Sequence, residues 1–414
     1  MENSKESKTT ILLIATLDTK GEEASFLKKV IESKGCKVIL MDTGILSTPK
    51  IKADIPREEV AKYGGIPIDE LLKLNDKGKC ILNMIKGAKQ GALKLYQEGI
   101  IDGVIGIGGA QGTDIGSSAM RALPIGFPKL MVSTVASGLT TFGPYVGTKD
   151  LTIMHSVADM QGLNFLTTQI LGNAAAAICG MVKNIKERKS VAPKGIPVAM
   201  SMLGTTTPGA LRAKKILEDA GFEVVAFHQN GTGGIAMEDL IMEGAFKGVL
   251  DINLHELADY VVGGLHGAIK DYRLESAGKV GIPQVIAPGS INYTVQGPLD
   301  KLKKELKKRK YIVHNPNLTL VRLSFDELEK VGKLVAEKLN KAKGPTYIYI
   351  PLKGFSYPDR EGLPHWEPEG NLRFINTLKE NIDPSIPLYE IDAHINDPEF
   401  ISIVVEKFIS LMKN

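Results

Sequence analysis

The chain has 414 residues, of which 43% are hydrophobic and 24% are charged, and its formal net charge is +4. This length exceeds what one hydrophobic core normally serves, which predicts two domains, and so small a net charge argues against a nucleic-acid-binding protein. The chain has three cysteines without a CxxC pair, a polar start (MENSKESK) and no run approaching ~20 apolar residues. These features predict a cytoplasmic chain without disulfides or membrane contact.

Apolar runs alternate with helical spacings along the first half. Strands are predicted at 10–15, 37–41, 103–107 and 129–132, with helices between them. A long helix before residue 183 is predicted to bury one stripe: Leu163, Leu166, Ile170, Ala174, Ala177, Ile178 and Met181. Such alternation predicts a parallel sheet with crossover helices, as in a Rossmann-like, doubly wound α/β fold.

A charged segment with two prolines, 183–197, predicts a linker between the domains 1–190 and 191–414. The pattern then repeats, because residues 17–44 align without a gap onto 203–230. We therefore expect two Rossmann-like domains related by internal duplication. The second has an extended C-terminal region, with a capping box at Ser324 and Glu327, strands at 347–351 and 388–391, and a last helix that begins at Asp397-Pro398.

The loop 106–118 (GIGGAQGTDIGSS) is rich in glycine where a strand meets a helix. Glycines let the backbone approach a ligand closely, and a helix start attracts anions. Thr113 is a candidate N-cap of this helix. The loop is neither a Walker P-loop nor a strict GxGxxG, because Gln111 stands where a glycine is needed. Tight packing of strand and helix is the alternative explanation.

The loop 203–209 (LGTTTPG) is a second candidate anion site. Thr207 is predicted to cap a helix with Pro208 at its first position, and no acid lies in the first turn. We therefore expect a carboxylate or phosphate near Thr205, Thr206 and Thr207. The matching first-half loop differs, since Thr19 and Glu22 have capping-box spacing there. The GTGG segment with Gly233 is a weaker candidate.

His255-Glu256 follows Asp251 near the end of a predicted strand, where a metal site or an acid–base pair is conceivable. Without a dense cluster of ligands, a polar helix start explains these residues better. No metal site is expected, no GxSxG elbow indicates a serine hydrolase, and the catalytic residues stay unknown.

Seven blocks in order resemble the tobamovirus-resistance-protein-like (Tm-one-like) ATP-binding domain family, otherwise an uncharacterised protein family. These blocks are TLDTK (16–20), GIGGAQGT (106–113), PKLMVSTVASG (128–138), ELADYVVGG (256–264), GIPQVIAPG (281–289), HNPNLTLVR (314–322) and DAHINDP (392–398). The resemblance implies two Rossmann-like subdomains, homodimerisation, and binding of ATP, alone or with Mg²⁺. It implies this ligand-facing set: Asp18, Thr19, Lys20, Gly108, Gly109, Gln111, Gly112, Thr113, Ser133, Thr134 and Ser137. The chain departs from the family at Asn253-Leu254-His255, where threonines are usual.

Three hypotheses remain. The first is a nucleotide-binding protein whose ligand, bound near the interdomain cleft, is structural or regulatory. The second is an enzyme acting on a phosphorylated or carboxylate metabolite in that cleft, with His314, Asn315, Glu256 and Asp251 as candidates. The third is an interaction scaffold whose glycines serve packing.

Overall fold

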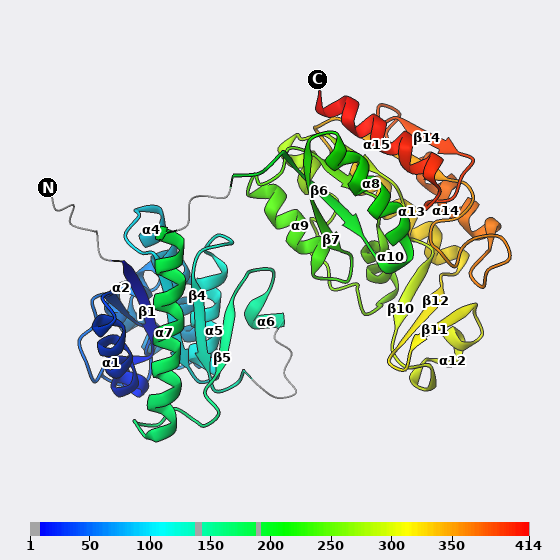
Figure 1. Cartoon of the computed structure of the whole chain (residues 1–414). Helices are drawn as coiled ribbons and strands as arrows, with labels where there is room; N and C mark the ends of the chain where they lie inside the picture. Colours follow the sequence, from blue (N-terminus) through cyan, green and yellow to red (C-terminus); the bar gives the residue numbers. More distant parts are fainter. Residues whose placement is uncertain (1–8, 137–142, 188–191, 414) are drawn as a thin grey trace, which may run out of the picture. The chain divides into compact units, whose positions relative to one another are not determined.

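The structure is a computed structural model that describes residues 9–136, 143–187 and 192–413 (Figure 1). The chain divides into two compact units, Met1–Val191 and Ala192–Asn414. Each unit contains a parallel sheet with helices on both faces, which confirms the predicted α/β class.

The N-terminal unit has a five-stranded parallel sheet in the order β2-β1-β3-β4-β5. Its strands are β1 (Thr10–Ala15), β2 (Lys37–Asp42), β3 (Gly103–Gly108), β4 (Lys129–Ser133) and β5 (Thr152–His155). The central strands β3 and β4 are buried along their whole length, as expected for a parallel sheet that is covered on both faces.

Helices cover this sheet on both faces. They are α1 (Leu17–Ser33), α2 (Arg57–Gly64), α3 (Ile68–Lys73), α4 (Lys77–Gln97), α5 (Ala110–Arg121), α6 (Gly143–Val146) and α7 (Phe165–Glu187). One core holds side chains of α1 and α7, and the other holds side chains of α2 to α5. Figure 1 shows α7 lying along the sheet beside α1.

Helix α7 differs from the sequence prediction in its buried stripe and in the length of its apolar segment. Its buried stripe is Thr167, Leu171, Ala174, Ala175, Ile178, Cys179 and Val182, whereas the predicted Leu163 is exposed. The stripe therefore lies mostly one position away from the prediction. In the described part of the chain, α7 is also the one helix long and apolar enough to cross a membrane. Its buried residues belong to the core of this unit.

The C-terminal unit has a six-stranded parallel sheet in the order β14-β13-β9-β8-β6-β7. Its strands are β6 (Ile196–Met202), β7 (Phe222–His228), β8 (Val249–Asp251), β9 (Gln284–Ile286), β13 (Thr346–Pro351) and β14 (Leu388–Ile391). A small antiparallel sheet, β10 (Tyr293–Gln296), β12 (Leu318–Arg322) and β11 (Tyr311–Asn315), is inserted between β9 and β13 in the chain (Figure 1, yellow). The sequence prediction omitted this small sheet.

The helices of this unit are α8 (Thr207–Asp219), α9 (Gly233–Met242), α10 (His255–Val262), α11 (Ser276–Val280), α12 (Lys304–Lys307), α13 (Phe325–Leu339), α14 (Pro368–Asn381) and α15 (Pro398–Met412). Helices α8 and α15 pack on one face, and α10, α13 and α14 on the other. The predicted capping box of Ser324 and Glu327 is present at the start of α13.

The two units begin alike. The repeated segments form α1 and β2 in one unit and α8 and β7 in the other, and each strand pairs in parallel with the strand before its helix. In both units the first strand lies between the second and the third. This order is common to doubly wound sheets, so descent from one duplicated unit stays a prediction.

Candidate functional site

Ligands of doubly wound sheets bind at the carboxyl ends of the strands, where the strand order reverses. In the N-terminal unit the order reverses between β1 and β3, and in the C-terminal unit between β6 and β8. The segments that follow these strands contain most of the predicted site residues, and the others follow β4 and β7.

Helix α5 begins directly after β3 with its N-terminus open. Its N-cap is Gly109, which provides no side chain, and its first turn has no acidic residue. In the described part of the chain, no hydrogen bond uses the N–H groups of Ala110, Gln111 and Gly112. These groups and the helix dipole suit an anion. The prediction that Thr113 caps this helix is wrong, because Thr113 lies inside α5 and is fully buried.

The glycines of this loop serve different purposes. A Cβ at Gly108 would lie 2.5 Å from Gly112 Cα, and one at Gly112 would lie 3.2 Å from the Ile107 carbonyl oxygen. Packing of strand against helix therefore explains Gly108 and Gly112. A Cβ at Gly109 would only touch Thr134 Oγ1 at an ordinary 3.6 Å. Packing alone therefore does not require glycine at position 109.

Ser133 ends β4 beside this loop. Its hydroxyl and that of Thr113 are 2.7 Å apart, and both side chains are fully buried. Ser133 Oγ also accepts a hydrogen bond from Val135 N at 3.1 Å. These two hydroxyls therefore hold α5 to β4, while Thr134 remains half-buried near Gly109. Ser137 lies outside the described residues.

Asp18, Thr19 and Lys20 lie in the first turn of α1. The Asp18 carboxylate accepts Leu46 N at 2.7 Å, so this side chain holds the loop after β2. Lys20, where the helix kinks, donates to the Met160 carbonyl oxygen. The predicted capping box is wrong, because Thr16 is the N-cap and Thr19 instead bonds the Thr16 hydroxyl at 2.9 Å. Of this group, only Thr19 is exposed.

The first turn of α8 uses its N–H groups within the chain, whereas the prediction left them open to an anion. Thr206, not Thr207, is the N-cap, and the N–H groups of Thr206 and Thr207 are bonded within the preceding 3₁₀ turn (Gly204–Thr206). Pro208 has no N–H, and Gly209 N donates to Asn396 Oδ1 at 3.1 Å. No N–H group of this first turn is left for a ligand, although a helix start without an acid suggested it.

The GTGG loop already binds an internal carboxylate. Glu256 Oε1 accepts Gly231 N at 2.8 Å and Gly234 N at 3.1 Å. A Cβ at Gly233 would lie 1.8 Å from the His228 carbonyl oxygen, and one at Gly234 would lie 1.7 Å from Glu256. These glycines therefore permit close packing and a bond to Glu256, an acid that the sequence assigned to the cleft.

Glu256 belongs to a buried ionic cluster around Arg273. The guanidinium bonds Asp251 at 2.7 Å, Glu256 at 3.0 Å and Glu238 at 3.2 Å, and Gln229 Oε1 accepts at 2.7 Å. Burial opposes the charge of Arg273, but these carboxylates raise its pKa. Burial also raises the pKa of Glu238, which Arg273 partly offsets. No pattern in the sequence identified Arg273.

Beside this cluster lies a pocket of about 310 Å³ at the carboxyl ends of β6 and β7. We call it the histidine pocket. It is roofed by the small sheet and lined by Leu203, Gly204, Thr205, His228, Asn230, His266, Tyr293, Val295, His314, Leu318 and Leu320. Three histidines and a tyrosine offer proton donors and acceptors to a polar ligand. The sequence singled out Thr205 and His314 but not His228, His266 or Tyr293.

A polar network lies behind Thr205 and Tyr293, two of the residues that line the histidine pocket. Thr205 Oγ1 lies 2.7 Å from Ser290 Oγ and 2.9 Å from the Tyr293 hydroxyl. Asn253 Nδ2 donates to Ser290 Oγ at 2.9 Å. Ser290 has a φ of 56°, in the left-handed region that non-glycine residues rarely adopt. Such strain gathers at functional sites.

Behind the pocket wall, His255, Asp259 and His266 bring their ligand atoms within 4.8 Å of one another. His255 and Asp259 are fully buried. Burial is the main reason that the pKa of His266 falls to about 4. Burial alone would raise the pKa of Asp259, but His255, Thr294 and the His266 N–H together lower it. The expected polar helix start is therefore a buried cluster of histidine and aspartate.

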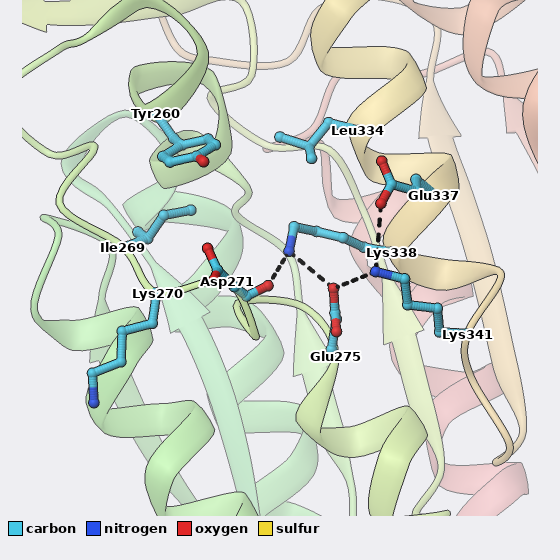
Figure 2. A pocket seen from close by; sticks show the side chains of 9 residues that line it. All are labelled: Tyr260, Ile269, Lys270, Asp271, Glu275, Leu334, Glu337, Lys338 and Lys341. Carbon is cyan, nitrogen blue, oxygen red and sulfur yellow. Dashed lines mark hydrogen bonds and ion pairs between the residues drawn. The ribbon is translucent and has the colours of Figure 1, made fainter.

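A second hollow of about 350 Å³ lies between α10, α11 and α13 (Figure 2). Figure 2 shows Glu275 held by both Lys338 and Lys341, each at 3.1 Å. The lining carries Lys270, Lys338 and Lys341 against Asp271, Glu275 and Glu337. Because three lysines and three acids of the lining balance and Glu275 is already held by two lysines, this hollow is a weaker candidate for an ionic ligand than the histidine pocket.

Comparisons with known proteins identify relatives over nearly the whole chain. The uncharacterised protein family UPF0261 matches with its N-terminal domain at residues 9–187 and its C-terminal domain at 196–412. A UPF0261 protein of Clostridium tetani is 44% identical over 97% of this chain and 99% of its own length. The ToMV resistance protein Tm-1 of Solanum lycopersicum is 34% identical over 99% of this chain, which spans 57% of that protein.

A solved UDP-N-acetylglucosamine 2-epimerase from Rickettsia bellii covers 98% of this chain and 96% of its own at 11% identity. Its TM-score is 0.24, which is too low to support a conclusion about the fold or the function of this chain.

The Arg273 cluster leads to a stability prediction. Arg273→Met leaves buried carboxylates without their cation, so the free energy of unfolding should fall by about 3–5 kcal/mol, measured by urea denaturation. The matched control is Arg212→Met, because Arg212 is exposed, and it should change stability by under ~0.5 kcal/mol. A loss as small for Arg273→Met as for the control would contradict the cluster's role.

His365 leads to a prediction about pH. It is fully buried, and burial together with the nearby Arg322 charge lowers its pKa to about 4. The unfolded chain takes up this proton near pH 6.5 and the folded chain only near pH 4. Stability is therefore complete above pH 6.5 and falls by up to about 3 kcal/mol as the pH drops towards 4.

In His365→Phe this part of the acid loss should disappear, measured by urea denaturation at pH 8 and pH 4.5. The comparison at pH 8 reports the packing effect alone and serves as the internal control. The same acid loss in both proteins would refute the assignment to His365.

Proposed function

Because this chain belongs to the uncharacterised protein family UPF0261, whose name assigns no activity, we propose a function from its own geometry: it binds a nucleotide. The proposed site is the switch point of the N-terminal unit. The phosphates would accept from the N–H groups of Ala110, Gln111 and Gly112 at the start of α5, beside the half-buried Thr134. The ligand is ATP, alone or with Mg²⁺.

One observation carries this proposal. Among the three predicted anion loops, only the helix start at α5 leaves all of its first three helical N–H groups without a partner within the part of the chain that the structure describes. Residues of the chain use those in the first turn of α8, and Glu256 uses those of Gly231 and Gly234 in the GTGG loop. Thr19 and Lys20 follow the neighbouring strand β1, so they lie at the same carboxyl edge of the sheet as the start of α5. We further propose a homodimer, as the family resemblance implies, in the cytoplasm, as the three cysteines without a CxxC pair suggest.

A second function is favoured by the histidine pocket. We propose that an enzyme reaction on a small phosphorylated or carboxylate metabolite takes place there. His228, His266 and His314 converge on one hollow with Thr205 and the Tyr293 hydroxyl, which suits proton transfer and the binding of an anion. Burial is the main reason that the pKa of Tyr293 rises to about 12, so this hydroxyl stays protonated and acts as a hydrogen-bond donor.

The nucleotide site is tested by Gly109→Val. Position 109 has extended backbone angles and room for a Cβ, so the variant should fold. Its γ-methyl groups would cover the free N–H groups. ATP at ~100 times its dissociation constant should stabilise the wild type by about 2.7 kcal/mol in thermal unfolding, and this increment should vanish in the variant.

The matched control is Gly180→Val in α7, where a Cβ meets nothing within 4 Å. It should keep the full response to ATP. An unchanged response in Gly109→Val would place the nucleotide elsewhere, and no response in the wild type would favour an interaction scaffold instead.

The pocket function is tested by native mass spectrometry of freshly purified protein. We expect the wild type to retain a small anionic metabolite and His314→Ala to retain at least ~10-fold less, since a hydrogen bond to a charged group contributes about 1.5–3 kcal/mol. His314 is exposed on β11, so its loss should not disturb the fold. His155→Ala in the N-terminal unit is the control. Equal retention by His314→Ala, or none by the wild type, would reject this function.

A further inference from the structure

The return of the chain after α10 brings three metal-ligating side chains together. His255 and Asp259 are one helical turn apart, on the same face of α10. Gly263 ends the helix in the left-handed conformation, with a φ of 70°. His266 then turns back so that its backbone N donates to Asp259 Oδ2 at 2.9 Å. This return therefore brings residue 266 to the side chain of residue 259.

The glycines of the segment GGLHG make this return possible. A Cβ at Gly264 would lie 2.3 Å from Asp259 Cγ and 2.4 Å from Thr294 Oγ1. A Cβ at Gly267 would lie 2.6 Å from the Asp259 carbonyl oxygen. Any other residue at these positions would push the loop away from Asp259. Two glycines therefore let the chain pass close to Asp259, Gly264 beside its carboxylate and Gly267 beside its backbone.

The hydrogen bond of His255 fixes the role of its ring nitrogens. Nδ1 lies 3.2 Å from the Ser290 carbonyl oxygen, which only accepts, so Nδ1 must carry a proton. In the neutral ring Nε2 then presents a lone pair, and it has no hydrogen-bond partner among the described residues. Asp259 Oδ2 lies 3.5 Å from this nitrogen. Two lone pairs facing each other in a dry interior require a positive species between them.

His266 presents the third donor. Within the part of the chain that the structure describes, its Nδ1 is buried without a hydrogen-bond partner, and the imidazole rings of His255 and His266 lie edge to face at 5.2 Å. A charged His255–Asp259 pair would satisfy two of the three side chains, but 3.5 Å is longer than the ~2.7–2.9 Å of a charge-assisted bond. It would also leave His266 Nδ1 unexplained.

We propose that His255, Asp259 and His266 bind a divalent first-row transition-metal ion, with Zn²⁺ as the expected ion. Two imidazoles and one carboxylate suit such ions, whereas Mg²⁺ and Ca²⁺ prefer oxygen ligands throughout. A carbonyl oxygen that orients a ligating histidine through its other nitrogen is the usual second partner, and Ser290 supplies it.

The surroundings favour a cation. Asp251, Glu256 and Glu238 are buried nearby against the single charge of Arg273. His266 also lines the histidine pocket, so the further coordination positions of the ion face that pocket. Three protein ligands with open positions are typical of catalytic sites. The ion would supply a Lewis acid to the proposed pocket reaction, but its binding depends on neither proposed function.

The test is titration of tag-free protein, stripped with a chelator, with Co²⁺ as the spectroscopic probe. We expect one Co²⁺ per chain with visible d–d absorption, and competition by Zn²⁺. His266→Ala should weaken Co²⁺ binding at least ~100-fold, because even loss of an outer-shell partner costs ~10–100-fold. His255→Gln should do the same. Thermal unfolding without metal should show that both variants fold.

The matched control is His155→Ala, which removes another half-buried histidine and should bind Co²⁺ as the wild type does. Equal binding by wild type and His266→Ala, or no stoichiometric binding by the wild type, would overturn the proposal in favour of a buried ion pair. Should His266→Ala fail to fold, His255→Gln decides. Loss of Co²⁺ binding with an intact ATP response separates this site from the nucleotide site.

Discussion

The C-terminal unit depends on how one buried arginine is compensated. Arg273 reaches carboxylates from three different elements, namely Glu238 of α9, Asp251 of β8 and Glu256 of α10. A guanidinium in the interior is tolerated only when such partners surround it, and the carboxylates are tolerated only because of the arginine. The strand end, the helix starts and the loop after β7 are therefore held in one arrangement. The polar network behind the histidine pocket is built on that arrangement, through Asn253, two residues beyond Asp251.

The same physics explains why similar loops differ in what they offer a ligand. A helix start has unsatisfied N–H groups that must find a partner. At α9 the partner is Glu256, and at α8 it is Asn396 together with the preceding turn. At α5 the structure gives the first three N–H groups no partner within the described residues. Whether a glycine- or threonine-rich loop is a binding site therefore depends on residues far away in the sequence.

The parallel sheets, the positions of strands β1 to β4 and the α13 capping box were predictable from the sequence. Hydrophobic period, capping and turn chemistry are local, so the sequence alone reveals them. The roles of Thr113, Thr19 and Thr207 were predicted wrongly for one reason. A hydroxyl before or near a helix start suggests a cap, but Thr113 bonds Ser133 from a neighbouring strand. Thr207 donates to Leu203 instead, because a 3₁₀ turn precedes the helix. Hydrogen-bond partners from elsewhere in the fold, and a 3₁₀ turn that precedes the helix, therefore outweighed the local preference of these threonines for a capping position.

The histidine cluster was hidden for a related reason. His255 and Asp259 have the spacing of helical ligands, yet such a pair alone is common on solvated helices. What makes the pair unusual is complete burial, and that follows from the small sheet that covers it: Val295 N, on β10, donates to Asp259 Oδ1 at 2.9 Å. The usable signal lay in the glycines at 263, 264 and 267, which have no reason to gather after a helix unless the chain must pass close to something. Close glycines beside a histidine and an aspartate one turn apart are therefore better evidence of a built site than either feature is alone.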